Sequence, residues 1–190
     1  MTTARRKQVC LEATPYYHCT TRCVRRAFLC GEDHASGKSF EHRKQWVVDR
    51  LNEITAVFSI QACAYAVMSN HYHVVVHIDK EAALNWSDDE VIDRWCTLYS
   101  GHMLVDRYRS GESLCSSELS VLKEIVTTWR ERLYDLSWFM CNLNEPIARL
   151  ANEEDNCRGR FWEGRYKSQA LLDEALCVNL ITGHFPEQII

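Results

Sequence analysis

The stretch Tyr65–Ile78, which reads YAVMSNHYHVVVHI, predicts the turn and the second strand of a β-hairpin. Two runs of aromatic, small and β-branched residues, Phe58–Met68 and His71–Ile78, are separated only by Ser69 and Asn70. That spacing favours a tight turn between antiparallel strands, in which side chains alternate between two faces. One face of the second run is the predicted core and carries Tyr72, Val74, Val76 and Ile78. The other face carries His71, His73, Val75 and His77.

His71 and His73 form a candidate metal site. Side chains two residues apart on a strand share a face at about 7 Å, so the two imidazoles can converge on one ion. His77 is too far along the strand, about 13 Å from His73, to be a third ligand. A divalent ion held there could polarise a phosphodiester, and strand cleavage would then need a hydroxyl nucleophile such as tyrosine or serine.

The remaining segments predict strands and helices in the order of an α+β fold. Strands are predicted at Tyr16–Cys23 and Arg165–Leu171, where aromatic and β-favouring residues gather. Helices are predicted at Glu41–Val57 and Glu118–Leu136, because apolar residues recur there at helical spacing. The order strand, helix, hairpin, helix, strand predicts a ferredoxin-like antiparallel sheet with packed helices.

Two segments interrupt this pattern. Gly31–Ser39 contains two glycines and turn-forming residues, and we expect a surface loop. Residues 80–117 are polar, acid-rich and irregular, which predicts an insertion with one short helix at Asp88–Tyr99.

The last third of the chain is expected to hold two more helices. Ser137 is a candidate cap for a helix that starts at Trp138, and Pro146 is expected to disrupt that helix or divide it in two. A further helix is expected at Asp173–Thr182.

Composition indicates one intracellular domain. A chain of 190 residues that is 46% hydrophobic suits a single domain spanning residues 1–190. The N-terminal sequence has no apolar run of signal-peptide length, and no stretch of about 18 apolar residues occurs, so we expect a cytoplasmic location. The ten cysteines are then expected to be reduced. The best candidate zinc ligands, His18, Cys19 and Cys23, lack a supporting CxxC motif.

Charge is segregated along the chain, although the net charge is −4. Residues 1–26 carry six arginines or lysines and one glutamate, and residues 158–167 carry four basic residues and one glutamate. Residues 79–93 carry six acidic residues and one lysine. Both basic segments border predicted strands, so neighbouring strands would join them into a patch suited to phosphates. Ordinary solvated charge explains the composition equally well. The predicted phosphate-contacting residues are Arg22, Arg25, Arg26, Arg158, Arg160, Arg165 and Lys167.

Four segments together make the chain resemble the HUH-superfamily single-tyrosine transposases, in particular the branch associated with REP elements. They are Tyr16–Arg22 (YYHCTTR), Ala66–Val76 (AVMSNHYHVVV), the helix around Arg130–Cys141, and Gly159–Glu174 (GRFWEGRYKSQALLDE). The resemblance covers roughly residues 10–176. It implies that His71 and His73 bind Mg²⁺ or Mn²⁺. It also implies single-stranded DNA, often hairpin DNA, as substrate, and a 5′-phosphotyrosine intermediate in DNA transposition.

One departure from the family concerns the nucleophile. Relatives continue after the equivalent of SQALLDEA with a helix reading approximately YVDLNPVRAG, which supplies the nucleophilic tyrosine and an asparagine that helps to hold the metal. Here Ala175 is followed by LCVNLITGHFPEQII, with no tyrosine beyond Tyr166. We expect residues 177–190 to be a divergent tail that arose by truncation or frameshift, with the third metal ligand missing. Tyr166 is the candidate substitute nucleophile, whereas Tyr17 and Tyr72 are expected to be structural.

Three functions remain open on the sequence. The first is a transposase-family DNA-binding protein, with or without a dimer, whose strand-cleavage site is incomplete and whose catalysis is impaired. The second is a non-catalytic hairpin-binding or regulatory remnant, in which Phe161, Trp162 and Tyr166 stack on bases or pack in the core. The third is an unrelated structural α+β protein with incidental histidines.

Overall fold

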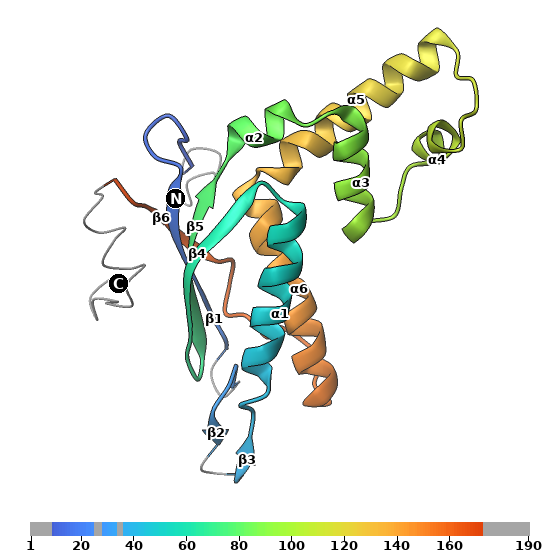
Figure 1. Cartoon of the computed structure of the whole chain (residues 1–190). Helices are drawn as coiled ribbons and strands as arrows, with labels where there is room; N and C mark the ends of the chain where they lie inside the picture. The colour runs from blue at the N-terminus through green and yellow to red at the C-terminus, as the bar shows by residue number, and fades with distance from the viewer. Residues whose placement is uncertain (1–8, 25–27, 34–35, 173–190) are drawn as a thin grey trace.

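Four antiparallel strands form a sheet with the order β4-β5-β1-β6 (Figure 1). The strands are β1 (Tyr16–Arg22), β4 (Ile60–Val67), β5 (His71–Ile78) and β6 (Lys167–Ala170). The computed structural model describes residues 9–24, 28–33 and 36–172. The first strand lies between the third and the fourth of the four, and the second is outermost, which is the strand order of a ferredoxin-like sheet. The α+β class with an antiparallel sheet predicted from the sequence is confirmed.

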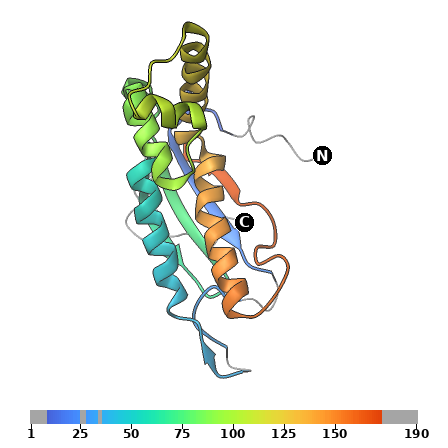
Figure 2. The same cartoon turned by 90° about the vertical axis from the view of Figure 1, so that its right-hand side faces the viewer.

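Two long helices cover one face of this sheet (Figure 2). They are α1 (Arg43–Val57) and α6 (Leu136–Glu154). The predicted core residues of β5 all face this layer, and Tyr72, Val74 and Val76 have no exposed surface. The apolar stripe of α1 is buried as predicted, with Val47 and Ile54 fully enclosed. The helix-covered face therefore contains the main hydrophobic core.

Helix α6 corrects two predictions from the sequence. Its cap is Asp135, whose Oδ1 accepts hydrogen bonds from Ser137 N at 2.6 Å and Trp138 N at 3.0 Å, so Ser137 lies inside the helix. Pro146 lies within the helix and does not divide it. Proline cannot donate to the carbonyl four residues before it. Here Arg50 Nε donates to that carbonyl, Asn142 O, at 2.8 Å, and so replaces the lost helical donor.

The segment 80–117 is mostly helical rather than irregular. It contains α2 (Lys80–Asn85), α3 (Asp88–Leu98) and α4 (Met103–Arg109), followed by α5 (Ser116–Leu133). The short helix predicted at Asp88–Tyr99 is confirmed as α3. Each of the three short helices has its own side-chain cap, which a reading based on apolar periodicity overlooks. Trp95 of α3 stacks on Trp129 of α5 with ring centroids 5.1 Å apart, and the outer half of α5 projects away from the sheet (Figure 1).

The segment Gly31–Ser39 also contains regular structure, a small hairpin of β2 (Glu32–Asp33) and β3 (Lys38–Ser39). Some predictions fall outside the described residues, namely those for Arg25, Arg26, the helix at 173–182 and the tail at 177–190. No helix in the described part of the chain has the length and apolar composition needed to cross a membrane.

Candidate functional site

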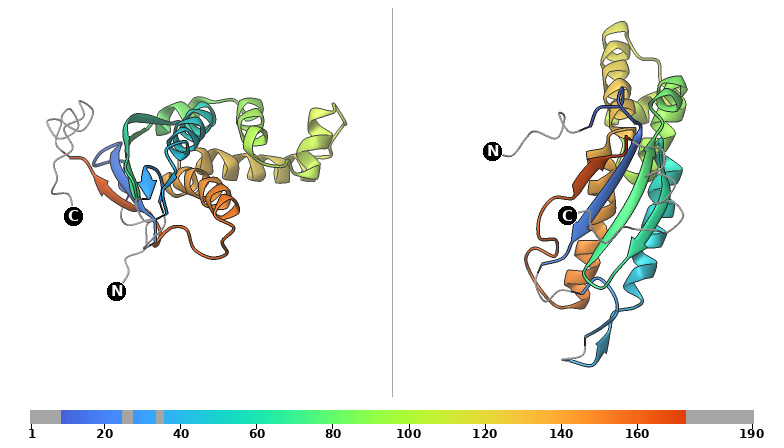
Figure 3. Two further views of the ribbon diagram at one scale, coloured as in Figure 1. Left: turned by 90° about the horizontal axis from the view of Figure 1, so that it is seen from below. Right: turned by 90° about the vertical axis from the view of Figure 1, so that its left-hand side faces the viewer.

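The predicted metal ligands and two predicted DNA-binding residues share the face of the sheet turned away from α1 and α6, which we call the histidine face (Figure 3, right). Directly opposed residues of antiparallel strands point to the same side. Thr20 of β1 opposes His73 of β5 on one side and Lys167 of β6 on the other. Arg22 opposes His71. The strand order therefore places Lys167, Thr20 and His73 in one row across the sheet, beside a row formed by Arg22 and His71.

A third histidine, His18, joins the predicted pair. His18 Nε2 lies 2.8 Å from His73 Nδ1, and the two rings stack with centroids 5.0 Å apart. Thr20 Oγ1 lies 3.1 Å from the same His73 nitrogen. The His71 ring meets the His73 ring edge-on, also at 5.0 Å. The three imidazoles thus form one contact cluster across β1 and β5.

Asn70 fixes the orientation of His71. Its side-chain oxygen lies 2.6 Å from His71 Nδ1. Because an amide oxygen only accepts hydrogen bonds, the proton resides on Nδ1 and the Nε2 lone pair of His71 is available to a ligand. Metal-binding histidines commonly donate their other N–H in this way.

Burial keeps the cluster uncharged. Burial lowers the pKa of His73 to about 4, with smaller contributions from the neighbouring His18 and His71. Burial also lowers the pKa of His71, aided by the nearby Arg22 guanidinium, and lowers the pKa of His18. Because their pKa values are lowered, all three rings are neutral near pH 7. Neutral imidazole is the form that binds metal ions.

Among the described residues, only His71 and His73 are suited to bind a metal ion, and they provide two ligands. His18 Nε2 is engaged with His73, and within the described ranges no group of three histidine, cysteine or acidic side chains is placed to hold an ion. Mg²⁺ and Mn²⁺ prefer oxygen ligands, so His71 and His73 would leave most coordination positions to water or phosphate oxygens. The zinc alternative fails geometrically, because Cys19 lies on the helix-covered face of β1 and its neighbour His18 lies on the histidine face.

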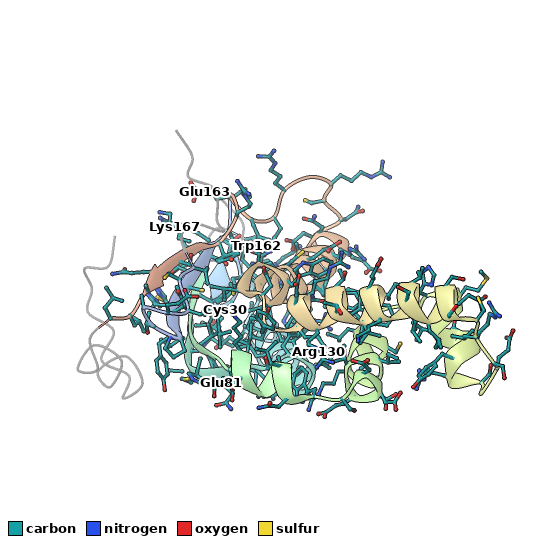
Figure 4. The ribbon with its side chains drawn as sticks, turned by 90° about the horizontal axis from the view of Figure 1, so that it is seen from above. Cys30, Glu81, Arg130, Trp162, Glu163 and Lys167 are labelled. Carbon is teal, nitrogen blue, oxygen red and sulfur yellow. The ribbon has the colours of Figure 1, made fainter. Side chains whose placement is uncertain are left out.

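Exposed cations lie on the histidine face and on the loop that leads into β6. We call Arg22, Arg158, Arg160, Arg165 and Lys167 the basic edge; all five are exposed. The loop after α6 follows the end of β1, because Glu163 N donates to Arg22 O and Val24 N donates to Phe161 O, each at 2.9 Å. Trp162 and Lys167 lie on this side of the molecule, away from Arg130 of α5 (Figure 4). In the part of the chain that the structure describes, no ion pair involves a member of the basic edge.

The aromatic residues of this loop pack in the core. Phe161 is only 3% exposed. The Trp162 indole Nε1 donates to Asn144 O at 2.8 Å, and its ring meets Tyr72 edge-on at 5.8 Å. These contacts favour packing over base stacking for both side chains.

The candidate nucleophile Tyr166 is also buried. It is 6% exposed within the main core, and its hydroxyl lies 3.2 Å from Ser137 Oγ. Tyr166 therefore lies on the helix-covered face of the sheet, opposite the face that carries His73. Tyr17 and Tyr72 are fully buried as expected, and the Tyr72 hydroxyl donates to Asn144 Oδ1 at 2.7 Å. None of these three hydroxyls faces the histidine cluster.

No protein-family model matches this chain. No curated protein matches it either. The transposase resemblance thus stays a prediction that rests on the motifs. His18 was considered only as a zinc ligand and Thr20 was not predicted as a site residue, although the alternation of YYHCTTR puts both on one face with Arg22. Asn144 gave no sequence signal, because its role depends on contacts with Tyr72 and Thr21 far away in the chain.

Proposed function

We propose that this chain binds single-stranded or hairpin DNA along the basic edge and the adjoining end of the histidine face. The observation that carries the proposal is the pair of exposed cations on the histidine face itself, Arg22 opposite His71 and Lys167 in the row of His73. Arg158, Arg160 and Arg165 are exposed on the loop that leads into β6, and among the described residues no carboxylate forms an ion pair with any of the five. Cations of this kind neutralise phosphates and release bound counterions. The other end of the histidine face is less accessible, because Val75 and Leu171 are buried there in a small apolar cluster. The DNA is therefore expected near Arg22 and His71.

The proposed DNA contact has an expected salt dependence. For single strands, the logarithm of the binding constant falls with the logarithm of salt concentration by about 0.7 per phosphate contact. Five contacts from the basic edge predict a slope of roughly −3 to −4. If the protein were structural and its charges incidental, the salt dependence of DNA binding would not change in this way when the five residues are replaced.

We further propose that strand cleavage by a phosphotyrosine is impaired. The candidate nucleophile Tyr166 and the central Tyr72 have buried hydroxyls with other partners on the opposite face. Tyr16 does lie on the histidine face, but at its other end beside His77, four residues and about 13 Å along β1 from Thr20, the residue opposite His73. The residues after Ala175 contain no tyrosine where the transposase pattern has one. A bound Mg²⁺ or Mn²⁺ would polarise a phosphate oxygen, while His71, oriented by Asn70, and His73 would hold its position. The function is then a DNA-binding remnant of a transposition enzyme.

One assay tests both parts. Labelled hairpin DNA with a single-stranded flank is incubated with the full chain and Mn²⁺, and complexes are resolved with and without denaturation. We expect a non-covalent complex and no denaturation-resistant adduct. A covalent adduct would refute the impaired-cleavage proposal. Absence of any complex at low salt would refute DNA binding and leave the structural alternative.

Histidine variants separate the metal from the DNA. Replacing His71 and His73 together by alanine is expected to abolish binding of Mn²⁺, measured by the loss of the free-ion paramagnetic resonance signal, and to leave hairpin affinity within about threefold because the phosphate contacts remain. The matched control is His42→Ala, which removes an exposed histidine that lies at the N-cap position of α1 and is paired with Glu154 of α6. Equal Mn²⁺ binding by wild type and the double variant would exclude the pair as a metal site.

A further inference from the structure

Strand β4 forms one edge of the sheet and is unusually poor in charge. The nine residues Ile60–Met68, IQACAYAVM, contain no acidic, basic or proline residue. The opposite edge, β6, has only four residues and begins with Lys167. Natural sheets protect long edge strands with charges, prolines or bulges, because an unpaired edge is a template for another strand. A bulge at Ala62–Ala64 protects the first half of β4 and leaves the second half regular.

The register of the hairpin shows which backbone groups of β4 face outward. Met68 N donates to His71 O at 2.8 Å. Hydrogen-bonded and non-hydrogen-bonded pairs alternate in an antiparallel ladder, so Ala66 bonds to His73, while Tyr65 and Val67 direct their N–H and C=O groups away from β5. Among the described strands, β4 has a neighbour on one side only. The Tyr65 side chain is 48% exposed.

We propose that the second half of β4 pairs antiparallel with β4 of a second copy of this chain, about a two-fold axis at Ala66. In this register Tyr65 of each copy opposes Val67 of the other, and the two pairs exchange four backbone hydrogen bonds. Ala66 faces its own symmetry mate, and Ala64 faces Met68. The contact joins two four-stranded sheets into one sheet of eight strands.

Self-complementarity selects a second copy as the occupant. In an isologous contact a residue meets the copy of a residue from the same patch, so a charged patch repels itself. The paired segment of β4 has no charge to repel. Alanine lies at the axis, where opposed backbones approach most closely, and the Tyr–Val pairs are of the aromatic and β-branched type that favours strand pairing.

The pairing also fixes the relation between the two histidine faces. Directly opposed residues share a face, so both faces lie on the same side of the joined sheet. Ala66 lies in the row of His73, Thr20 and Lys167. The His73 residues of the two copies are then separated by three strand spacings, about 14 Å. This arrangement would present two copies of the proposed DNA surface on one side, although the strand pairing itself does not depend on DNA binding.

The first test measures the oligomeric state of the full chain without DNA. Sedimentation across a concentration series is expected to give a reversible monomer–dimer equilibrium for the wild type. Tyr65→Lys, which places two lysines at the contact, is expected to raise the dimer dissociation constant at least about tenfold. The matched control, Gln61→Lys, adds the same charge to the same strand outside the paired segment and is expected to dimerise like wild type. A monomeric wild type, or a dimer unaffected by Tyr65→Lys, would overturn the proposal.

A second variant tests the register. The two Ala66 Cα atoms are expected about 4.5 Å apart, within the range that a disulfide spans. Ala66→Cys is therefore expected to add a disulfide-linked dimer on mild oxidation that neither the wild type nor Gln61→Cys forms. Thermal unfolding of each variant, followed by circular dichroism, confirms that it is folded. A folded Ala66→Cys variant with no additional cross-link would contradict the two-fold at Ala66. Because neither assay contains DNA, their failure is distinguishable from failure of the proposed function.

Discussion

The arginines of the helical layer and those of the basic edge have opposite surroundings. Most arginines of the six helices, which we call the helical layer, bind carboxylates, as in the pairs Arg43–Glu154, Arg94–Glu90, Arg107–Glu118 and Arg130–Asp88. On the basic edge no described carboxylate pairs with any of the five cations. The comparison teaches that a net charge of −4 is compatible with a phosphate-binding surface, because most acidic residues are placed among the helices.

The comparison divides the expected effects of arginine variants. Removing a paired arginine should change the free energy of unfolding and leave DNA affinity unchanged. Removing a cation of the basic edge should do the reverse. Exposed ion pairs contribute little to stability, so the largest effect on unfolding is expected where the arginine is buried.

Arg43→Ala is expected to have the largest effect. The Arg43 side chain is fully buried, donates to Glu154 Oε2 at 2.7 Å and to Phe28 O at 2.8 Å, and stacks on Phe40 at 4.3 Å. Its removal leaves Asp155 without its ion-pair partner, whereas Glu154 keeps His42, and solvent reaches both carboxylates in part. We therefore expect a loss of ~2–4 kcal/mol in the free energy of unfolding. Urea unfolding measures it. Arg149→Ala is the control, because its exposed pair with Glu145 should change stability by less than about 0.5 kcal/mol. Equal effects of the two substitutions would contradict the division.

The triple variant Arg22→Ala, Arg160→Ala and Lys167→Ala is expected to have the second largest effect, on DNA rather than on folding. Loss of three charged contacts of ~1 kcal/mol each weakens hairpin binding by about 10²-fold at low salt. The slope of the salt dependence should become shallower by about 2. Fluorescence anisotropy with labelled hairpin DNA measures both. Arg149→Ala again serves as the control and should bind like wild type. If Arg149→Ala weakened binding as much as the triple variant does, the phosphate contacts would not be localised on the basic edge.

The pH dependence of the free energy of unfolding is expected to show a smaller difference, between the histidine cluster and the helical layer. Burial lowers the pKa of His73 from about 6.5 to about 4, so the unfolded chain takes up more protons between these values. The contribution of His73 is complete above pH 6.5 and is lost as pH falls toward 4. In α5, a backbone hydrogen bond from Cys115, together with Arg107, lowers the pKa of Glu118 to about 2, so its contribution is lost only below about pH 4.5. His73→Gln should flatten the pH profile of urea unfolding between pH 6.5 and 4.5, and Glu118→Gln should not. A reversed result would refute this assignment of the two pH windows.

The sequence predicted the features that depend only on residues close together in the chain. Alternation in β5 separated His71 and His73 from Tyr72 and Val74, because the period of a strand is a local property. The row of Lys167, Thr20 and His73 could not be predicted in detail, since it depends on strand order and register. The helical content of residues 80–117 was underestimated because each helix is short and is stabilised by its cap and by aromatic stacking.

Pro146 provides the last and smallest expected effect. The expectation that it would divide α6 followed from a correct local rule, but Arg50, 92 residues before Asn142, supplies the missing donor. Pro146→Ala provides a backbone N–H to the same carbonyl, so Arg50→Ala should cost less in that background. We expect a coupling of ~1 kcal/mol in a double-mutant cycle measured by urea unfolding. The Arg50–Glu53 ion pair is lost in both backgrounds and therefore cancels. Additive effects would mean that water serves the Asn142 carbonyl as well as Arg50 does, and that the packing of Leu143 and Ile147 alone holds the helix together.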